Sequence, residues 1–276
     1  MKNIFLITML ALLTFGLRAQ DKKNDTLKIK WNKSRIWVFD DSKNLHDTIN
    51  NKEKVKKADF THWSGIDIGV NMLTTLDNKF SIMEANDTLQ MNMFLDLNYS
   101  KSIFISLNLW EKSIALYKNN LILLTGIGSE WNSYNFKQNI TLNTNADYIS
   151  ASNTLINIKT NYQKNKLKIW YVKVPLLLEL NTNNKKYKKS FHVSGGFEFA
   201  YKLGSKTKQM YEADKVEYKI KTKDDFHLAD FKYSTVMRIG YGNYFTVFAN
   251  YALSSLFEKN KGPDIYPFTT GLTFSF

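Results

Sequence analysis

The chain has 276 residues, of which 43% are hydrophobic and 14% aromatic, and its formal net charge is +13. With 3 Pro and no Cys, the composition excludes collagen-like, wholly disordered and disulfide-stapled proteins, as well as thiol catalysis, Cys-based zinc sites and a lipoprotein anchor. The mean hydropathy of −0.35 is that of a soluble protein. A transmembrane β-barrel gives a similar average, however, because its strands alternate between apolar and polar faces.

The N-terminus has the features of a secretory signal peptide over residues 1–19. Lys2 provides a positive start, residues 4–16 are almost uninterruptedly apolar, and Ala19 offers a small residue at a cleavage position. An exported chain does not meet chromosomal DNA, so we expect no nucleic-acid partner despite the basic charge.

Residues 20–60 are polar and Lys-rich with one apolar island at 36–39, and we interpret them as an extended periplasmic segment. A spanning helix needs about 20 mostly apolar residues, whereas the best later run, 174–180, is interrupted by Glu179. If the mature chain enters a membrane, it must therefore do so as a closed β-barrel, which satisfies every backbone hydrogen-bonding group.

Eight segments after residue 61 alternate apolar and polar residues with the period of a β-strand. In the first of them, Ile66 and Ile68 share one face, and Asp67 and Gly69 share the other. In chain order the predicted strands are 62–74, 95–110, 121–136, 167–180, 191–203, 231–240, 244–254 and 268–276. The sequence thus predicts an all-β fold, namely an eight-stranded antiparallel up-and-down transmembrane β-barrel over 61–276 with an N-terminal extension.

The gaps between these strands alternate in length. Long polar gaps at 75–94, 137–166, 204–230 and 255–267 alternate with short ones at 111–120, 181–190 and 241–243. This alternation is typical of an up-and-down barrel with long outer loops and short periplasmic turns. Within the fourth strand, Pro175 removes a ladder hydrogen bond, which predicts a bulge or kink.

Charged residues recur on the polar faces, which would line the barrel interior. An isolated buried charge costs several kcal/mol, so we expect these groups to pair. The network predicted on this basis consists of Asp67, Glu130, Lys173, Glu179, Glu198 and Arg238, with Asp96, Lys202 and Lys232 on the same faces. Its expected centre is Asp67, Glu130, Glu198 and Lys173, with Arg238 nearer the periplasmic rim. A narrow polar path for ions or small solutes is the alternative.

The histidines and aromatic residues offer further candidate sites. His227 lies in a long outer gap with Asp224 and Asp225, which is a general-base combination, although a solvated loop histidine is the simpler interpretation. His192 is expected near the periplasmic end of the fifth strand. We expect no catalytic residue, metal site or cofactor. Interfacial aromatic girdles are predicted at Trp63, Trp110, Trp131, Trp170, Tyr201, Tyr233 and Tyr266.

The last strand carries alternating apolar residues up to a terminal aromatic: Phe268, Leu272, Phe274 and Phe276. In this respect the chain resembles bacterial outer-membrane β-barrels, whose terminal strand ends in Phe and is recognised by the barrel-assembly machinery. More closely, residues 62–276 resemble the PorT-like outer-membrane β-barrel domain family, through the stretches 62–71, 95–100, 110–118 and 126–130 and the lead-in 25–30. The resemblance implies an eight-stranded outer-membrane barrel in a family mostly of unassigned function, some of whose members serve protein secretion.

We therefore expect a non-enzymatic integral protein of the Gram-negative outer membrane, with a scaffold or interaction role linked to protein secretion or envelope assembly. Its expected partners are outer-membrane lipid and lipopolysaccharide, the barrel-assembly machinery and an envelope protein. Two alternatives stay open. One is a lipid-A-modifying enzyme with a loop histidine at the outer rim. The other is a lipocalin-like barrel, which would place its apolar faces inward around a ligand.

Overall fold

The computed structural model describes residues 27–31, 34–38, 62–76, 94, 96–117, 120–144, 147–153, 162–182, 190–213, 215–242 and 245–275. The chain divides into two units, 1–55 and 56–276, and each is described by itself. The predicted signal peptide lies outside the described residues. Among the described residues, no helix has the length and apolar character needed to cross a membrane.

In the first unit the described residues form a two-stranded antiparallel hairpin. Strand β1 (Leu27–Trp31) pairs with β2 (Ser34–Val38), so that Leu27 faces Val38 and Trp31 faces Ser34. Residues 36–38 of the apolar island predicted from the sequence lie in β2. The described part of this segment is therefore extended, as predicted, and its strands pair with each other.

The second unit is all-β, as predicted, and one sheet holds most of its strands. These are β3 (Gly65–Thr74), β4 (Ile103–Tyr117), β5 (Leu121–Asn135), β8 (Lys164–Asn181), β9 (Phe191–Ala213), β10 (Val216–Lys223), β11 (Phe231–Tyr241), β12 (Phe245–Ala252) and β13 (Tyr266–Ser275). A 3-10 turn, η2 (Tyr99–Lys101), precedes β4. Strands β6 (Ile140–Asn143) and β7 (Ser150–Asn153) form a separate hairpin.

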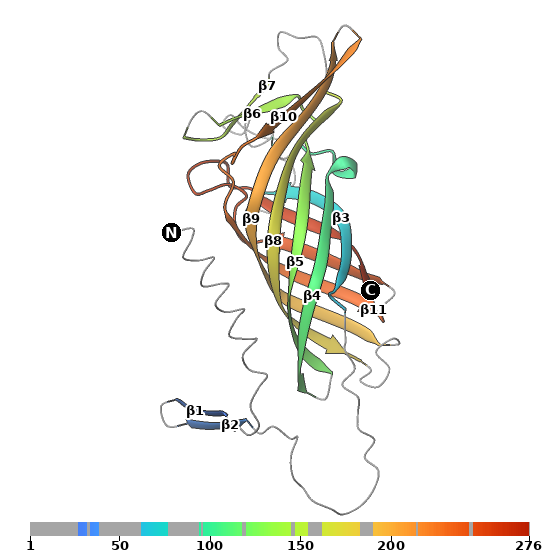
Figure 1. The fold of residues 1–276 in the computed structure, drawn as a ribbon, viewed down its shortest axis with the longest axis vertical. Helices are drawn as coiled ribbons and strands as arrows, with labels where there is room; N and C mark the ends of the chain where they lie inside the picture. Colours follow the sequence, from blue (N-terminus) through green and yellow to red (C-terminus); the bar gives the residue numbers. More distant parts are fainter. Residues whose placement is uncertain are drawn as a thin grey trace, which may run out of the picture. The chain divides into compact units, whose positions relative to one another are not determined.

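The large sheet closes into a ring of antiparallel strands (Figure 1). Its order is β10-β9-β11-β12-β13-β3-β4-β5-β8, and β8 pairs in addition with β9, which closes the circuit and leaves β10 as an extra strand beside β9. The first strand of the ring, β3, pairs with the last, β13, so that Ile68 faces Leu272. Closure removes the unpaired edges that an open sheet would expose.

The ring buries its polar face and exposes its apolar face. In β11, Tyr233 and Met237 are 48% and 52% exposed, whereas Ser234 and Arg238, which alternate with them, are 0% and 3% exposed. The same alternation runs along β5 and β8. Because successive side chains of a strand point to opposite faces, the predicted assignment of the two faces is confirmed. The alternation of long and short connections is also observed.

Two predicted boundaries are wrong for an identifiable reason. Strand β4 begins at Ile103 and continues to Tyr117, through most of the gap predicted at 111–120. Register shifts at Asn108/Trp110 and Ala115/Tyr117 interrupt the period-2 pattern there. Likewise, β9 and β10 form a hairpin inside the gap predicted at 204–230. Val216, Tyr218 and Ile220 do alternate with charged residues in β10, but every residue of the strand is exposed, so this pattern marks a strand without a buried face.

Pro175 does not cause the predicted bulge. It pairs with Glu198 of β9 in regular register. Towards β5, the pairing is interrupted between Thr125↔Leu176 and Gly128↔Lys173, but it resumes in the same register. The backbone of Pro175 has no N–H to donate, and the chain accommodates this by an interruption in the β5–β8 ladder. The register shift of the β8–β9 ladder lies elsewhere, at Trp170/Tyr171.

An apolar cluster closes the interior at the end of the ring where the long connections emerge. It contains strand-end residues such as Leu73 and Leu167 together with Phe94, Phe226 and Leu228 from the connections, and most of its members are fully buried. The ring interior is therefore capped by apolar side chains at this end, which we call the apolar cap.

The closure between β3 and β13 can be tested with introduced cysteines, since the native chain has none. We expect Ile68→Cys/Leu272→Cys to form an intrachain disulfide on mild oxidation, because these residues lie directly opposite each other. Mass spectrometry after thiol alkylation reports the bond. The control Ile68→Cys/Phe199→Cys places the second thiol on β9, which does not pair with β3, and should remain reduced. Equal cross-linking of both pairs would contradict the closed ring.

Candidate functional site: the buried charge network

Four predicted charges, supplied by four different strands, meet inside the ring. Arg238 Nη2 lies 2.9 Å from Asp67 Oδ1, and Lys173 Nζ lies 3.1 Å from Glu198 Oε2 and 3.6 Å from Asp67 Oδ2. All four side chains are almost completely buried. The structure thus brings together two anions and two cations, which we call the central network.

Neutral side chains complete the hydrogen bonding of the two carboxylates. Asp67 accepts hydrogen bonds from the Thr273 hydroxyl at 2.6 Å and from the Asn108 amide at 3.0 Å. Glu198 accepts one from the Asn250 amide at 3.0 Å. A buried ion pair is stable only when its remaining lone pairs and protons are also satisfied. These donors meet that requirement.

Aromatic rings flank both cations of the central network. The Arg238 guanidinium lies 5.6 Å from the centroid of Phe248, and Lys173 Nζ lies 5.8 Å from the centroids of Trp63 and Phe104. The negative faces of aromatic rings attract such cations at these distances. The apolar residues among the polar ones therefore support the network as well as filling space.

Glu130 belongs to a second group, closer to the apolar cap. Its ion-pair partner is Lys232, and it also accepts a hydrogen bond from the Asn132 amide at 2.9 Å. Lys232 Nζ in turn lies 4.9 Å from the centroid of the Tyr171 ring. Lys202 pairs with Asp225 at 2.5 Å, at the start of the outer connection. The central position predicted for Glu130 is therefore wrong, because Lys232 sits closer to it.

Glu179 joins a third group at the opposite end, with two histidines that the predicted network did not include. Glu179 Oε1 lies 2.7 Å from His62 Nδ1, and the His62 and His192 rings stack with centroids 4.1 Å apart. His192 Nε2 hydrogen-bonds Thr246 Oγ1 at 3.0 Å. His192 lies on the polar face of β9 together with Glu198, so the alternation of β9 could have predicted that His192 points into the ring. His62 precedes β3, where no periodicity marks it as buried.

Trp63 is buried in the interior, so its predicted place in an interfacial girdle is wrong. Its exposed fraction is 1%. A Cβ atom added to Gly126 would lie 2.5 Å from Trp63 Cζ3, and one added to Gly128 would lie 3.2 Å from Cη2. The backbone N–H groups of Trp63 and Ser64 donate to Glu111 Oε2 at 3.0 and 2.9 Å. The two glycines thus make room for an indole that Glu111 holds in place.

Other predicted girdle residues do face outward. Trp110, Trp131, Trp170 and Tyr233 are exposed, and the rings of Trp131 and Trp170 stack at 6.2 Å. On the last strand, Leu272 and Phe274 are also exposed. Phe276, the final residue of the predicted assembly signal, lies outside the described residues, and that signal stays a prediction.

The carboxylates beside His227 are engaged by other groups. Thr144 Oγ1 donates to Asp224 Oδ2 at 2.6 Å, and the backbone N–H of Asp225 donates to Asp224 Oδ1 at 2.7 Å. These two donors lower the pKa of Asp224. Asp225 pairs with Lys202 and so holds the connection against β9, whereas Asp224 holds it against the connection between β6 and β7 through Thr144. Within the part of the chain described here, no group of three or more His, Asp or Glu side chains is arranged to hold a metal.

Comparison with known families identifies the ring. Residues 62–258 match the family described as the outer membrane protein beta-barrel domain. The chain belongs to this family. No curated protein and no solved structure matches it. The protein is therefore an integral outer-membrane β-barrel protein located in the outer membrane, as expected, and its exposed apolar face is the face turned towards lipid.

The central network predicts the effect of removing its lysine. We expect Lys173→Met to lower the free energy of unfolding by about 3–5 kcal/mol, because it leaves buried carboxylates without their cation. Urea unfolding of the refolded protein in detergent, followed by tryptophan fluorescence, measures the change.

Two variants control for this effect. The exposed pair Lys137–Asp96 offers a matched Lys137→Met substitution that should leave stability unchanged. Adding Glu198→Gln to Lys173→Met should restore part of the loss, because the neutral amide no longer needs the cation and still has Asn250 beside it. An unchanged unfolding midpoint for Lys173→Met alone would contradict the network.

Proposed function

We propose that this protein is a non-enzymatic scaffold of the outer membrane, an eight-stranded up-and-down β-barrel of the PorT-like type. Its outer connections and periplasmic N-terminal segment would engage an envelope protein in secretion or envelope assembly. The observation that carries the proposal is a ring with an apolar exterior and an interior filled by mutually paired charges. Barrel-assembly machinery and outer-membrane lipid are its other proposed partners, and nucleic acid is not one.

The pairing circuit supports the count of eight strands. It runs through β3, β4, β5, β8, β9, β11, β12 and β13 and returns to β3. Eight strands give an interior just wide enough for side chains to fill. The paired charges and the apolar cap occupy that space, which favours a structural interior over the alternative of a narrow solute path.

The two other functions considered from the sequence receive no such support. A lipocalin-like barrel needs an apolar interior, whereas the middle of this ring holds Asp67, Lys173, Glu198 and Arg238. A lipid-A-modifying enzyme needs a loop histidine with a free acidic or hydroxyl partner. Here Asp224 and Asp225 are held by Thr144 and Lys202.

Orientation and membrane integration can be measured together. We expect the membrane fraction to resist salt extraction and the protein to shift in gel mobility on heating, as a closed barrel unfolds. An epitope tag inserted at Lys215, in the β9–β10 turn, should be reached by antibody on intact cells. A tag inserted within 183–189, in a short connection, should be reached only after the outer membrane is permeabilised. Release by salt, or the reverse labelling, would contradict the proposal.

The scaffold role is tested separately by affinity capture from detergent-solubilised membranes. We expect a reproducible envelope protein that is lost when residues 20–60 are deleted. The deletion variant must still show heat-dependent mobility, which establishes that the barrel has assembled. If the intact chain captures no reproducible partner, the scaffold role is contradicted while the barrel assignment stands.

A further inference from the structure

Six lysines form a grid across three adjacent strands. In one row, Lys168 of β8 faces Lys206 of β9, which faces Lys223 of β10. In the next row, Lys166, Lys208 and Lys221 are opposed in the same way. Residues directly opposite on neighbouring strands share a face with Cβ atoms about 4.5–5.5 Å apart, and like charges at such positions are destabilising. We call these residues the lysine grid.

No carboxylate of the described residues forms an ion pair with the lysine grid. Across the described residues, the ion pairs formed by lysines on these strands involve Lys173, Lys202 and Lys219, and none includes a grid member. Lys166 Nζ donates to the carbonyl oxygen of Lys101 at 3.1 Å, which brings a further lysine close. Among the described residues the lysines of the grid therefore repel one another, and an anion bound between them would relieve that repulsion.

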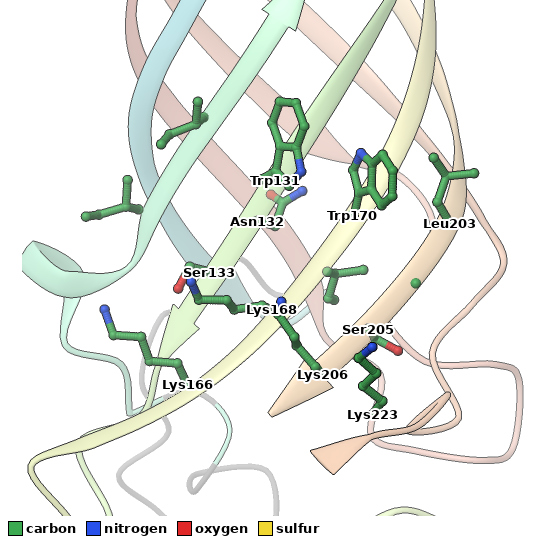
Figure 2. Close-up of a pocket in the computed structure, with 14 residues that line it drawn as sticks. Trp131, Asn132, Ser133, Lys166, Lys168, Trp170, Leu203, Ser205, Lys206 and Lys223 are labelled. Carbon is green, nitrogen blue, oxygen red and sulfur yellow. The ribbon is translucent and has the colours of Figure 1, made fainter. Parts of the chain in front are cut away.

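A groove of about 660 Å³ lies beside the grid on the outer surface of the ring. Figure 2 shows its two parts: the indoles of Trp131 and Trp170 on the strands, and the side chains of Lys166, Lys168 and Lys206 nearer the connections. Its other lining residues include Ile103, Ile105, Leu203, Gly204 and Lys223. One amphipathic molecule could therefore contact both the apolar wall, formed by the tryptophans, isoleucines and Leu203, and the cationic end, formed by the lysines.

The backbone leaves this groove open. The register between β8 and β9 shifts at Trp170/Tyr171, so that Leu203 has no partner on β8. At the next residue, Gly204, an added Cβ would find no atom within 4 Å. Gly204 therefore contributes no side chain to the space between the Trp170 ring and the lysines of β9.

The groove also lies at the edge of the apolar exterior. Along the outward face of β8, Lys166 and Lys168 give way to Trp170 and then to Leu176 and Leu178. Exposed tryptophans mark the interface between hydrocarbon and headgroups in such barrels. In the proposed orientation, the lysine grid thus stands at the headgroup level of the outer leaflet, with the apolar wall below it.

We propose that the lysine grid and its groove form a specific binding site for the phosphorylated glycolipid of the outer leaflet, lipid A. The lipid phosphates would lie between the lysine rows and replace repulsion with attraction, since lysine ammonium groups bind phosphate as point charges. An acyl chain would cover Ile105, Trp131 and Leu203. A lipid fits both parts of the groove with one molecule, whereas a soluble anion would occupy only the end formed by the lysines. This inference rests on the proposed membrane orientation.

The test compares two lipids and two charge-matched variants. Refolded protein in detergent is titrated with lipid A and with chemically dephosphorylated lipid A, and binding is followed by native mass spectrometry. The site variant Lys168→Gln/Lys206→Gln/Lys223→Gln removes one row. The control variant Lys112→Gln/Lys215→Gln/Lys259→Gln removes the same charge from exposed positions off the grid.

We expect the site variant to lose affinity for lipid A on the order of 100-fold, since each lysine beside an anionic surface contributes a factor of about five. The control variant should bind within about twofold of the native protein, because its lysines lie off the grid. Dephosphorylated lipid A should bind the native protein and the site variant equally weakly. In lipid-free detergent, the site variant should melt at a higher temperature than the native protein, because repulsion within the grid is removed.

Three outcomes would overturn the site: equal lipid A affinity in both variants, equal affinity of the native protein for the two lipids, or displacement of lipid A by inorganic phosphate at the same concentration. The last result would assign the grid to a free anion. Heat-dependent gel mobility of each variant shows that it has folded. If that mobility shift is absent from the native protein, the barrel assignment fails, which separates that failure from failure of the lipid site.

Discussion

Ion pairs that cross the interior hold together strands which do not hydrogen-bond to one another. Asp67 on β3 pairs with Arg238 on β11 and with Lys173 on β8, and neither of these strands is a neighbour of β3 in the ring. Backbone ladders fix each strand only to the next. The ion pairs across the interior also fix strands on opposite sides of the ring relative to one another. They favour the polar face pointing inward, because the same charges would have no partner if they faced outward.

That constraint organises the rest of the interior into layers. At the short-turn end Glu179 meets the stacked His62 and His192, the central network follows, and Glu130 with Lys232 lies below the apolar cap. Each layer pairs its carboxylates with cationic or histidine side chains, and the apolar cap fills the end where the connections emerge. An interior arranged in this way stabilises the ring from within.

The sequence predicted the parts of the fold that follow from period-2 alternation and failed where other constraints decide. Strands β8 and β11 alternate cleanly, so their faces were accessible from the sequence. Asp67, Lys173, Glu198 and Arg238 were expected to belong to one network, but Glu130 was expected at its centre and Arg238 nearer the periplasmic rim. The continuation of β4 was hidden by its bulges. Strand β10 alternates apolar and charged residues, but it lies in a lysine-rich segment that was interpreted as a gap. The burial of Trp63 depends on Gly126 from a distant strand, which no local pattern records.

Strand β9 is long enough to extend well beyond the apolar band of the ring. Its 23 residues, at about 3.3 Å each, extend to roughly 75 Å, whereas the apolar band of an outer-membrane barrel is about 25 Å tall. Even a strongly tilted strand leaves a long stem above that band, and Figure 1 shows the β9–β10 hairpin rising past the other strands. The stem carries Tyr211 and Tyr218, stacked at 5.2 Å, beyond the lysine rows. Strand β8 accompanies β9 as far as Met210, so only the last residues of the β9–β10 hairpin stand free of it. In the proposed orientation, the outermost side chains include those of Glu212, Lys215 and Glu217, which carry charges of both signs and lie beyond the aromatic pair.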